Sequence, residues 1–193
     1  MNTPGPWLAL QTKPRSEQKI EYMLRQKGYE SFTPMYRRKR RWSDRIVEID
    51  SPLFPMYVFC RLNPGMQSEA ISTPGVIRIV GFGGKPAPVA AEEIEALQLL
   101  SQSKYLREPW RYLPDGTAVL VETGPLTGIQ GTICQDESKR RLVISITLLQ
   151  RSVAIQLDDE TVITVVADMK GRSTGLSRES EMAVRLLQRK ALP

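Results

Sequence analysis

The residue types that most often carry out chemistry are scarce in this sequence. Its 193 residues contain no histidine and only two cysteines, Cys60 and Cys134, which lie far apart in the chain. Histidine is the side chain that usually transfers protons near neutral pH, and zinc sites are usually built from closely spaced cysteine and histidine ligands. The sequence therefore predicts no metal, no cofactor and no enzymatic activity.

Two short motifs look like ligand-binding sequences but lack essential residues. In Gly81-Phe-Gly-Gly-Lys85 the lysine is followed by proline, whereas a phosphate-binding P-loop needs serine or threonine there and a longer glycine spacing. Asp158, Asp159 and Glu160 are consecutive, so their carboxylates point in different directions and no fourth cation ligand is evident. We expect a glycine-rich turn at the first motif and a solvated hairpin turn at the second.

Positive charge is concentrated near the N-terminus. Residues 1–45 contain eleven Lys and Arg against four Asp and Glu, a net charge of +7, whereas the whole chain carries +6. A local basic excess is typical of proteins that bind polyanions, and Tyr36 and Trp42 add faces on which bases could stack. The sequence thus indicates a nucleic-acid contact, with a solvated basic loop as the alternative interpretation. The densest run consists of Arg37, Arg38, Lys39, Arg40 and Arg41.

These side chains must be positioned by an N-terminal unit in which strands and helices interleave. We predict a strand at 7–12, a helix at 16–27, a strand at 29–36, a basic hairpin or loop at 37–45, a short helix at 67–72, a strand at 76–80 and a helix at 91–105. The strand within 52–62 is the most informative, because its side chains alternate between two faces. One face carries Met56, Val58, Cys60 and Leu62 and is a core face. The other carries Tyr57 and Phe59, which a helix or an outside partner must cover.

The C-terminal half has a different residue pattern. Five short β-branched runs at 118–121, 128–134, 142–149, 153–157 and 162–165 are separated by turn residues, which is typical of a small barrel. We therefore predict an α+β protein, in which residues 5–106 form an antiparallel sheet with flanking helices. A linker at 107–114 would lead to a five-stranded SH3-like β-barrel at 115–167. Residues 168–193 would be a flexible tail that contains a short amphipathic helix.

The composition indicates a soluble chain. Hydrophobic residues make up 41% of it and charged residues 25%, and no run approaches the roughly 20 apolar residues of a membrane span. The first residues lack the charged and then apolar layout of a signal peptide. We expect a cytoplasmic monomer that does not contact membranes.

Several motifs resemble the NusG-type transcription elongation and antitermination factors. The N-terminal half carries Trp7-x-x-x-x-Thr12-Lys13, Pro52-Leu-Phe-Pro-x-Tyr57-Val-Phe59 and Gly84-Lys-Pro-Ala-Pro-Val89, which are similar to the NGN domain of that family. Asp115-Gly-Thr-Ala-Val-Leu-Val-Glu-Thr-Gly to Gly131 is similar to its KOW motif. Details such as Arg41-Trp-Ser-Asp-Arg45 look closest to the specialised RfaH-like and UpxY-like paralogs.

The resemblance implies a function and a set of contact residues. Such a bacterial factor binds the clamp helices of RNA polymerase and suppresses pausing and termination, here at particular operons. It implies that Phe54, Tyr57 and Phe59 form the clamp-binding surface, which agrees with the uncovered strand face. Non-template DNA would be contacted by Lys13, Arg15, Gln26 and Lys27, with phosphate contacts from Arg37, Arg38, Lys39, Arg40 and Arg41. Ribosomal protein S10 is a further implied partner, at Leu148, Leu149 and Arg151.

A free RNA-binding or ribosome-associated KOW module is the alternative function, and it would bind RNA without polymerase.

The C-terminal region of RfaH can refold between a helical hairpin and a barrel. Here the many β-branched residues, with Pro125 and the glycines at 116, 124, 128 and 131, disfavour a helix. We predict a permanent barrel on a mobile linker that leaves the clamp-binding surface open.

Overall fold

The computed structural model describes residues 4–112, 117–136, 139–157 and 161–166. An N-terminal sheet has the strand order β2-β5-β1-β6, with β9 also paired to β1, and all its described pairs are antiparallel. Its strands are β1 (Trp7–Thr12), β2 (Ser31–Phe32), β5 (Tyr57–Arg61), β6 (Val76–Ile79) and β9 (Pro88–Val89). Its helices are α1 (Glu17–Gln26), α2 (Gln67–Ile71) and α3 (Ala91–Gln102). The predicted elements of this half are thereby confirmed, with two differences. The α3 helix ends before residue 105, and the predicted strand at 29–36 is divided, because β2 covers only Ser31–Phe32 and a separate hairpin begins at Met35.

The predicted alternation of β5 is confirmed where the strand is regular. Val58 and Cys60 join the apolar cluster that contains Ile20 and Leu24 of α1, four residues apart on one helix face. Phe59 belongs to the other cluster, on the opposite face of the sheet. Met56 does not follow the alternation, because it precedes the strand in a turn with a φ of 70°.

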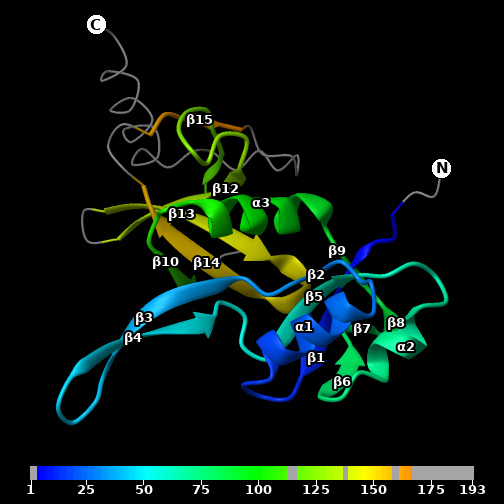
Figure 1. The fold of residues 1–193 in the computed structure, drawn as a ribbon. Helices are drawn as coiled ribbons and strands as arrows, with labels where there is room; N and C mark the ends of the chain where they lie inside the picture. The colour runs from blue at the N-terminus through cyan, green and yellow to red at the C-terminus, as the bar shows by residue number, and fades with distance from the viewer. Residues whose placement is uncertain (1–3, 113–116, 137–138, 158–160, 167–193) are drawn as a thin grey trace, which may run out of the picture.

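A long hairpin leaves the body of the molecule between β2 and β5. Its strands are β3 (Met35–Arg41) and β4 (Ile46–Pro52), which pair only with each other among the described strands. Figure 1 shows this hairpin projecting from the N-terminal sheet. The predicted basic hairpin is therefore present. A second, tight hairpin of β7 (Gly81–Phe82) and β8 (Lys85–Pro86) turns at Gly83 and Gly84, whose positive φ values of 56° and 77° suit glycine.

The C-terminal half forms a second antiparallel sheet with the order β10-β14-β13-β12-β11-β15. Its elements are β10 (Arg107–Trp110), β11 (Thr117–Val121), β12 (Gln130–Asp136), β13 (Lys139–Ile146), a 3-10 turn η1 (Thr147–Leu149), β14 (Arg151–Gln156) and β15 (Ile163–Val165). The five predicted strands are confirmed within a few residues, and with them the α+β class. The predicted tail and the carboxylates at 158–160 lie outside the described residues.

The linker prediction is wrong for residues 107–110, which form the edge strand β10 paired to β14. Pro109 is compatible with this strand, because an edge strand has one side that makes no ladder hydrogen bonds. The guanidinium of Arg107 fastens this strand to the N-terminal half. It donates to the carbonyl oxygen of Met35 at 2.8 Å and to that of Leu100 at 3.0 Å, at the end of α3.

The prediction of a barrel that is merely tethered is also wrong in this structure. One continuous apolar cluster contains Phe54 and Phe59 from the N-terminal sheet region, Leu97 from α3, and Ile144 and Val153 from the C-terminal sheet. In Figure 1, α3 lies next to β13, which it contacts. The α3 helix thus joins the two sheets through a shared core. Local sequence patterns could not indicate this docking, because it depends on contacts between distant segments.

Candidate functional site

The aromatic residues expected to bind the polymerase clamp are not equivalent in the structure. Phe54 and Phe59 are fully buried and meet edge to face, with ring centroids 5.6 Å apart and planes at 80°. Tyr57 is only partly buried. The expected face is therefore present, but it is covered, so Phe54 and Phe59 are core residues here and only Tyr57 reaches the surface.

The loop before β5 is held in place by a buried carboxylate. Glu17, at the start of α1, accepts a hydrogen bond from the backbone N–H of Met56 at 2.8 Å. Glu17 is 5% exposed, and an ionised acceptor makes a stronger hydrogen bond than a neutral one. This bond ties the turn before β5 to α1. No local sequence pattern indicated this contact, because Glu17 and Met56 lie 39 residues apart in the chain.

Tyr57 meets a residue that was expected to face a different partner. The guanidinium of Arg151, at the start of β14, lies 5.0 Å from the centroid of the Tyr57 ring. The same group donates a hydrogen bond to the carbonyl oxygen of Pro55 at 3.1 Å. Leu148 and Leu149 of η1 pack against the shared core, and η1 lies beside β9. The surfaces expected for the clamp and for S10 therefore contact each other.

A second polar contact joins α3 to η1, four residues before Arg151 in the chain. The carboxylate of Glu93, in the first turn of α3, accepts hydrogen bonds from the N–H and the hydroxyl of Thr147 at 3.1 and 2.8 Å. Burial raises the pKa of Glu93, although the two hydrogen bonds from Thr147 act in the opposite direction. We call the group Pro55, Tyr57, Glu93, Thr147 and Arg151 the domain junction. Sequence patterns carried no signal for it, because its members come from three separate segments of the chain.

The basic residues around α1 do not form a single cluster. Lys13 and Arg15 are exposed in the loop before the helix, whereas Gln26 and Lys27 lie at its other end. A ten-residue helix separates them by about 15 Å. The amine of Lys27 already donates to the backbone carbonyl of Glu69 and to the Thr73 hydroxyl, at 3.1 and 2.9 Å. Lys13, Arg15 and Gln26 are thus the freer candidates for a ligand.

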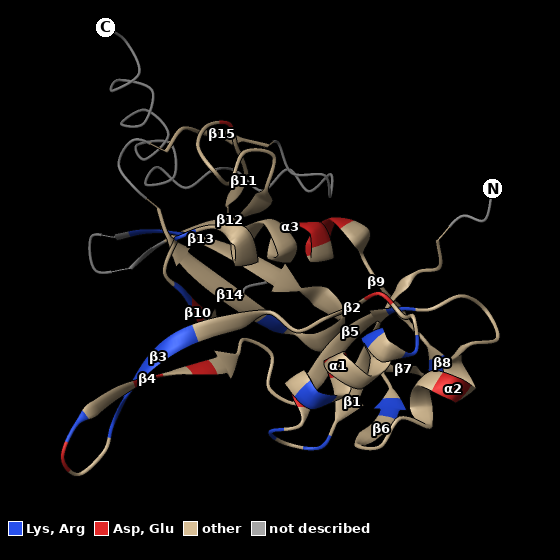
Figure 2. Cartoon of the chain, in the orientation of Figure 1, with Lys and Arg blue, Asp and Glu red and all other residues tan. Residues whose placement is uncertain are grey.

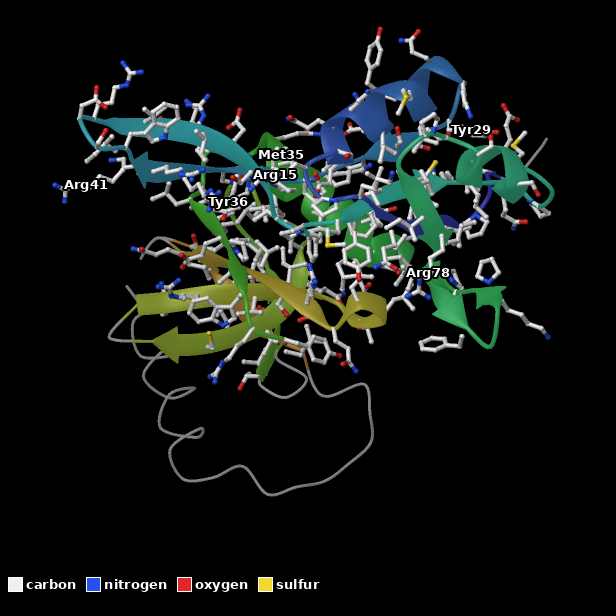
Figure 3. The ribbon with its side chains drawn as sticks, turned by 90° about the horizontal axis from the view of Figure 1, so that it is seen from below. Arg15, Tyr29, Met35, Tyr36, Arg41 and Arg78 are labelled. Carbon is white, nitrogen blue, oxygen red and sulfur yellow. The ribbon has the colours of Figure 1, made fainter. Side chains whose placement is uncertain are left out.

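The hairpin carries the densest positive charge among the described residues. All five basic residues from Arg37 to Arg41 are exposed, and Figure 2 shows them as a blue band along β3. Figure 3 shows Tyr36 near the base of the hairpin and Arg41 at its far end. At the tip, Trp42 is 51% exposed and the guanidinium of Arg45 lies 5.8 Å from its ring centroid. The predicted combination of cations and an aromatic face is present.

Within the described part of the chain, no three His, Cys, Asp or Glu side chains gather as a metal site would require. Burial raises the pKa of the Cys60 thiol to about 12, so it is not a reactive nucleophile. No described helix is long and apolar enough to cross a membrane.

The sequence was compared with protein-family models and with known proteins. Residues 5–98 match the family model of the transcription termination factor NusG. The transcription termination/antitermination protein NusG of Thermus thermophilus is 26% identical over 123 residues, which cover 58% of this chain and 66% of that protein.

Two solved structures are also similar. The structure titled "Domain interaction in Thermotoga maritima NusG" has a TM-score of 0.43 and a sequence identity of 23%. The match covers 79% of this chain and 92% of the Thermotoga maritima chain. The MjSpt4:Spt5 complex in its conformation A has a TM-score of 0.29 at 16% identity and covers 82% of this chain and 98% of its own.

The family match confirms the NusG resemblance, while the closer RfaH-like or UpxY-like assignment stays a prediction. NusG-family transcription factors are not enzymes, so the expectation of no catalytic activity is also confirmed. Residues 5–98 of this chain therefore form a NusG-family domain, and the chain is similar to transcription termination and antitermination proteins of the NusG type.

Proposed function

We propose that this chain is an elongation factor that binds the clamp helices of RNA polymerase and suppresses pausing and termination at particular operons. The observation that carries the proposal is the NusG-family domain at residues 5–98, with its Phe54, Tyr57 and Phe59 motif on one face of the sheet. We assign the cytoplasm as its location and a monomer as its state. Residues 5–106 and 115–167 are the proposed domains.

Tyr57 is the proposed direct contact with polymerase. Phe54 and Phe59 support it from the core, because both are fully buried. The proposed S10 residues Leu148, Leu149 and Arg151 lie at or beside the same junction. A clamp helix and S10 would therefore each have to separate Arg151 from Tyr57 before binding.

Non-template DNA is the proposed second partner. Lys13, Arg15 and Gln26 are exposed on the α1 side, and the residues Arg37 to Arg41 are exposed on the hairpin. Lys27 has a smaller part in this proposal, because its amine is held by Glu69 and Thr73. A strand displaced next to polymerase would meet these side chains beside α1 and along the hairpin.

Polymerase pull-down with matched tyrosine variants tests this function. Tyr57→Ala should lose most binding to core polymerase, since partner-facing aromatics contribute about 2 kcal/mol or more. Tyr22→Ala is the matched control, because Tyr22 is 64% exposed on α1, away from the junction, and should bind as the original chain does. Equal binding by both variants would contradict the assignment of Tyr57.

Arg151→Ala distinguishes two effects that Tyr57→Ala combines: loss of the contact between Tyr57 and Arg151, and loss of the proposed contact between Tyr57 and polymerase. It removes the same cation–π pair as Tyr57→Ala but keeps the tyrosine. We expect it to raise polymerase affinity about two- to fivefold, because the competing contact is worth about 0.5–1 kcal/mol. Binding of RNA with no binding of polymerase by any variant would instead support the free KOW module.

A further inference from the structure

The two faces of the β3–β4 hairpin differ in charge, although the sequence of β3 is almost uniformly basic. In an antiparallel ladder, directly paired residues project to the same face. The register pairs Arg37 with Asp50 and Lys39 with Glu48. Both acids of β4 therefore share one face with these two cations, and Arg37 Nε lies 3.8 Å from Asp50 Oδ1. We call this the paired face.

The opposite face has cations and no acid from β4. The register pairs Arg38 with Ile49 and Arg40 with Val47. Both arginines are exposed, while the two β-branched side chains beside them are partly buried and form an apolar floor. We call this the open face.

The tip extends the open face with an aromatic ring. The N–H of Trp42 donates to the carbonyl oxygen of Arg45 at 2.8 Å, which continues the register by one more pair. Trp42 therefore follows Arg38 and Arg40 at a spacing of two residues, about 7 Å per step along the strand. Asp44 lies in the turn, outside the ladder. The result is a strip of cations on an apolar floor that ends at an exposed indole.

This strip fits a single strand of nucleic acid better than a duplex. Phosphates would meet the guanidinium groups, and unstacked bases would contact the floor and stack on Trp42. A duplex keeps its base faces stacked, so it would use the cations and leave the apolar floor and indole without a partner. On the paired face a phosphate would first have to displace Asp50 and Glu48.

We propose that the hairpin binds single-stranded nucleic acid through its open face alone, with Arg38 and Arg40 on phosphates and Trp42 on a base. The inference deepens the DNA contact described under Proposed function and rests on it. It restricts the hairpin's part of that contact to Arg38 and Arg40. Arg37, Lys39 and Arg41 project to the paired face and receive no binding role, although they lie in the same basic run.

Two double variants with the same charge change test the proposal in the full chain. Arg38→Gln with Arg40→Gln removes two open-face cations, and Arg37→Gln with Lys39→Gln removes two paired-face cations. Fluorescence anisotropy would measure binding of each to a labelled oligothymidine of about 12 nucleotides, over a series of salt concentrations. We expect the open-face variant to weaken binding tenfold or more and to lower the salt slope by about 1.4, at roughly 0.7 per phosphate contact. The paired-face variant should change affinity less than threefold.

One more variant tests the role of Trp42, and two further ligands test the preference for a single strand. Trp42→Ala should weaken oligothymidine binding at least fivefold with an unchanged salt slope, because stacking releases no counterions. If oligouridine binds as tightly as oligothymidine, the hairpin recognises a single strand of either RNA or DNA. Tighter binding of a duplex of equal length, or equal losses from the two double variants, would overturn the proposal. Because these ligands are free of polymerase, a failure here is distinct from a failure of the polymerase pull-down.

Discussion

Replacing Phe59 by alanine tests whether the aromatic face of β5 is a closed core or an open surface. Phe59 has no solvent exposure and packs in the cluster that joins both sheets through α3. Its ring also meets Phe54 edge to face, with centroids 5.6 Å apart. The substitution would leave a cavity that the surrounding backbone of two sheets and a helix can close only in part.

The expected loss of unfolding free energy follows from this burial. Phe→Ala changes at fully buried sites cost about 3–5 kcal/mol. The edge-to-face pair favours the upper part of that range, because such pairs add roughly 0.5–1.5 kcal/mol. For a chain of this size, each kcal/mol lowers Tm by about 2–4 °C, so the expected fall is roughly 6–20 °C.

Thermal and denaturant unfolding followed by circular dichroism would measure the change in the full chain. Tyr57→Ala is the control on the same strand, because Tyr57 is only partly buried and stacks on Arg151. It should cost about 1.5 kcal/mol or less, chiefly the cation–π contact and some apolar area. The two neighbouring aromatics would thus differ by at least about 1.5 kcal/mol.

A loss of less than about 1 kcal/mol for Phe59→Ala would refute this reasoning, because a side chain exposed to solvent leaves no cavity when it is removed. That result would mean that α3 and the C-terminal sheet do not cover β5 in solution. The clamp-binding surface would then be open without any rearrangement of the junction.

Three further predictions concern Arg107, the junction residue Glu93 and the two cysteine thiols. Arg107→Met should lower the unfolding free energy by about 2–4 kcal/mol in denaturant titrations, because the hydrogen bonds to Met35 and Leu100 carbonyls are lost while the aliphatic stem is kept; a loss below 1 kcal/mol would contradict the anchoring role. Because burial raises the pKa of Glu93 in the folded state, the folded chain holds this proton more tightly than the unfolded chain. Its contribution to stability therefore falls as pH rises from the ordinary glutamate pKa through the raised one, and unfolding free energies measured over that interval should show a smaller fall for Glu93→Gln. Since burial raises the pKa of Cys60 to about 12, a thiol reagent at pH 8 should modify Cys134 in the folded chain and reach Cys60 only after unfolding; early labelling of Cys60 would show that its cluster opens.

Local patterns in the sequence determined most of the elements and their faces. The helix α1 was predicted, and its Ile20 and Leu24 lie four residues apart on one buried face. The alternation of Val58 and Cys60 with Phe59 predicted the two faces of β5. The β-branched runs predicted five strands of the C-terminal sheet, and the zero histidine count argued against an enzyme. These features depend on residues within a few positions of each other, where backbone geometry alone sets the period.

Tertiary structure decided what covers each face and which charges remain available. Phe59 became a core residue because α3 and the C-terminal sheet, distant in sequence, pack on it. Residues 107–110 became a strand because β14 offered an edge for pairing. The uniform basic run separated into two unlike faces because the register brought Asp50 and Glu48 opposite Arg37 and Lys39. Each outcome depends on how separate strands and helices pair and pack, and the free energy of such contacts is not encoded in any local period.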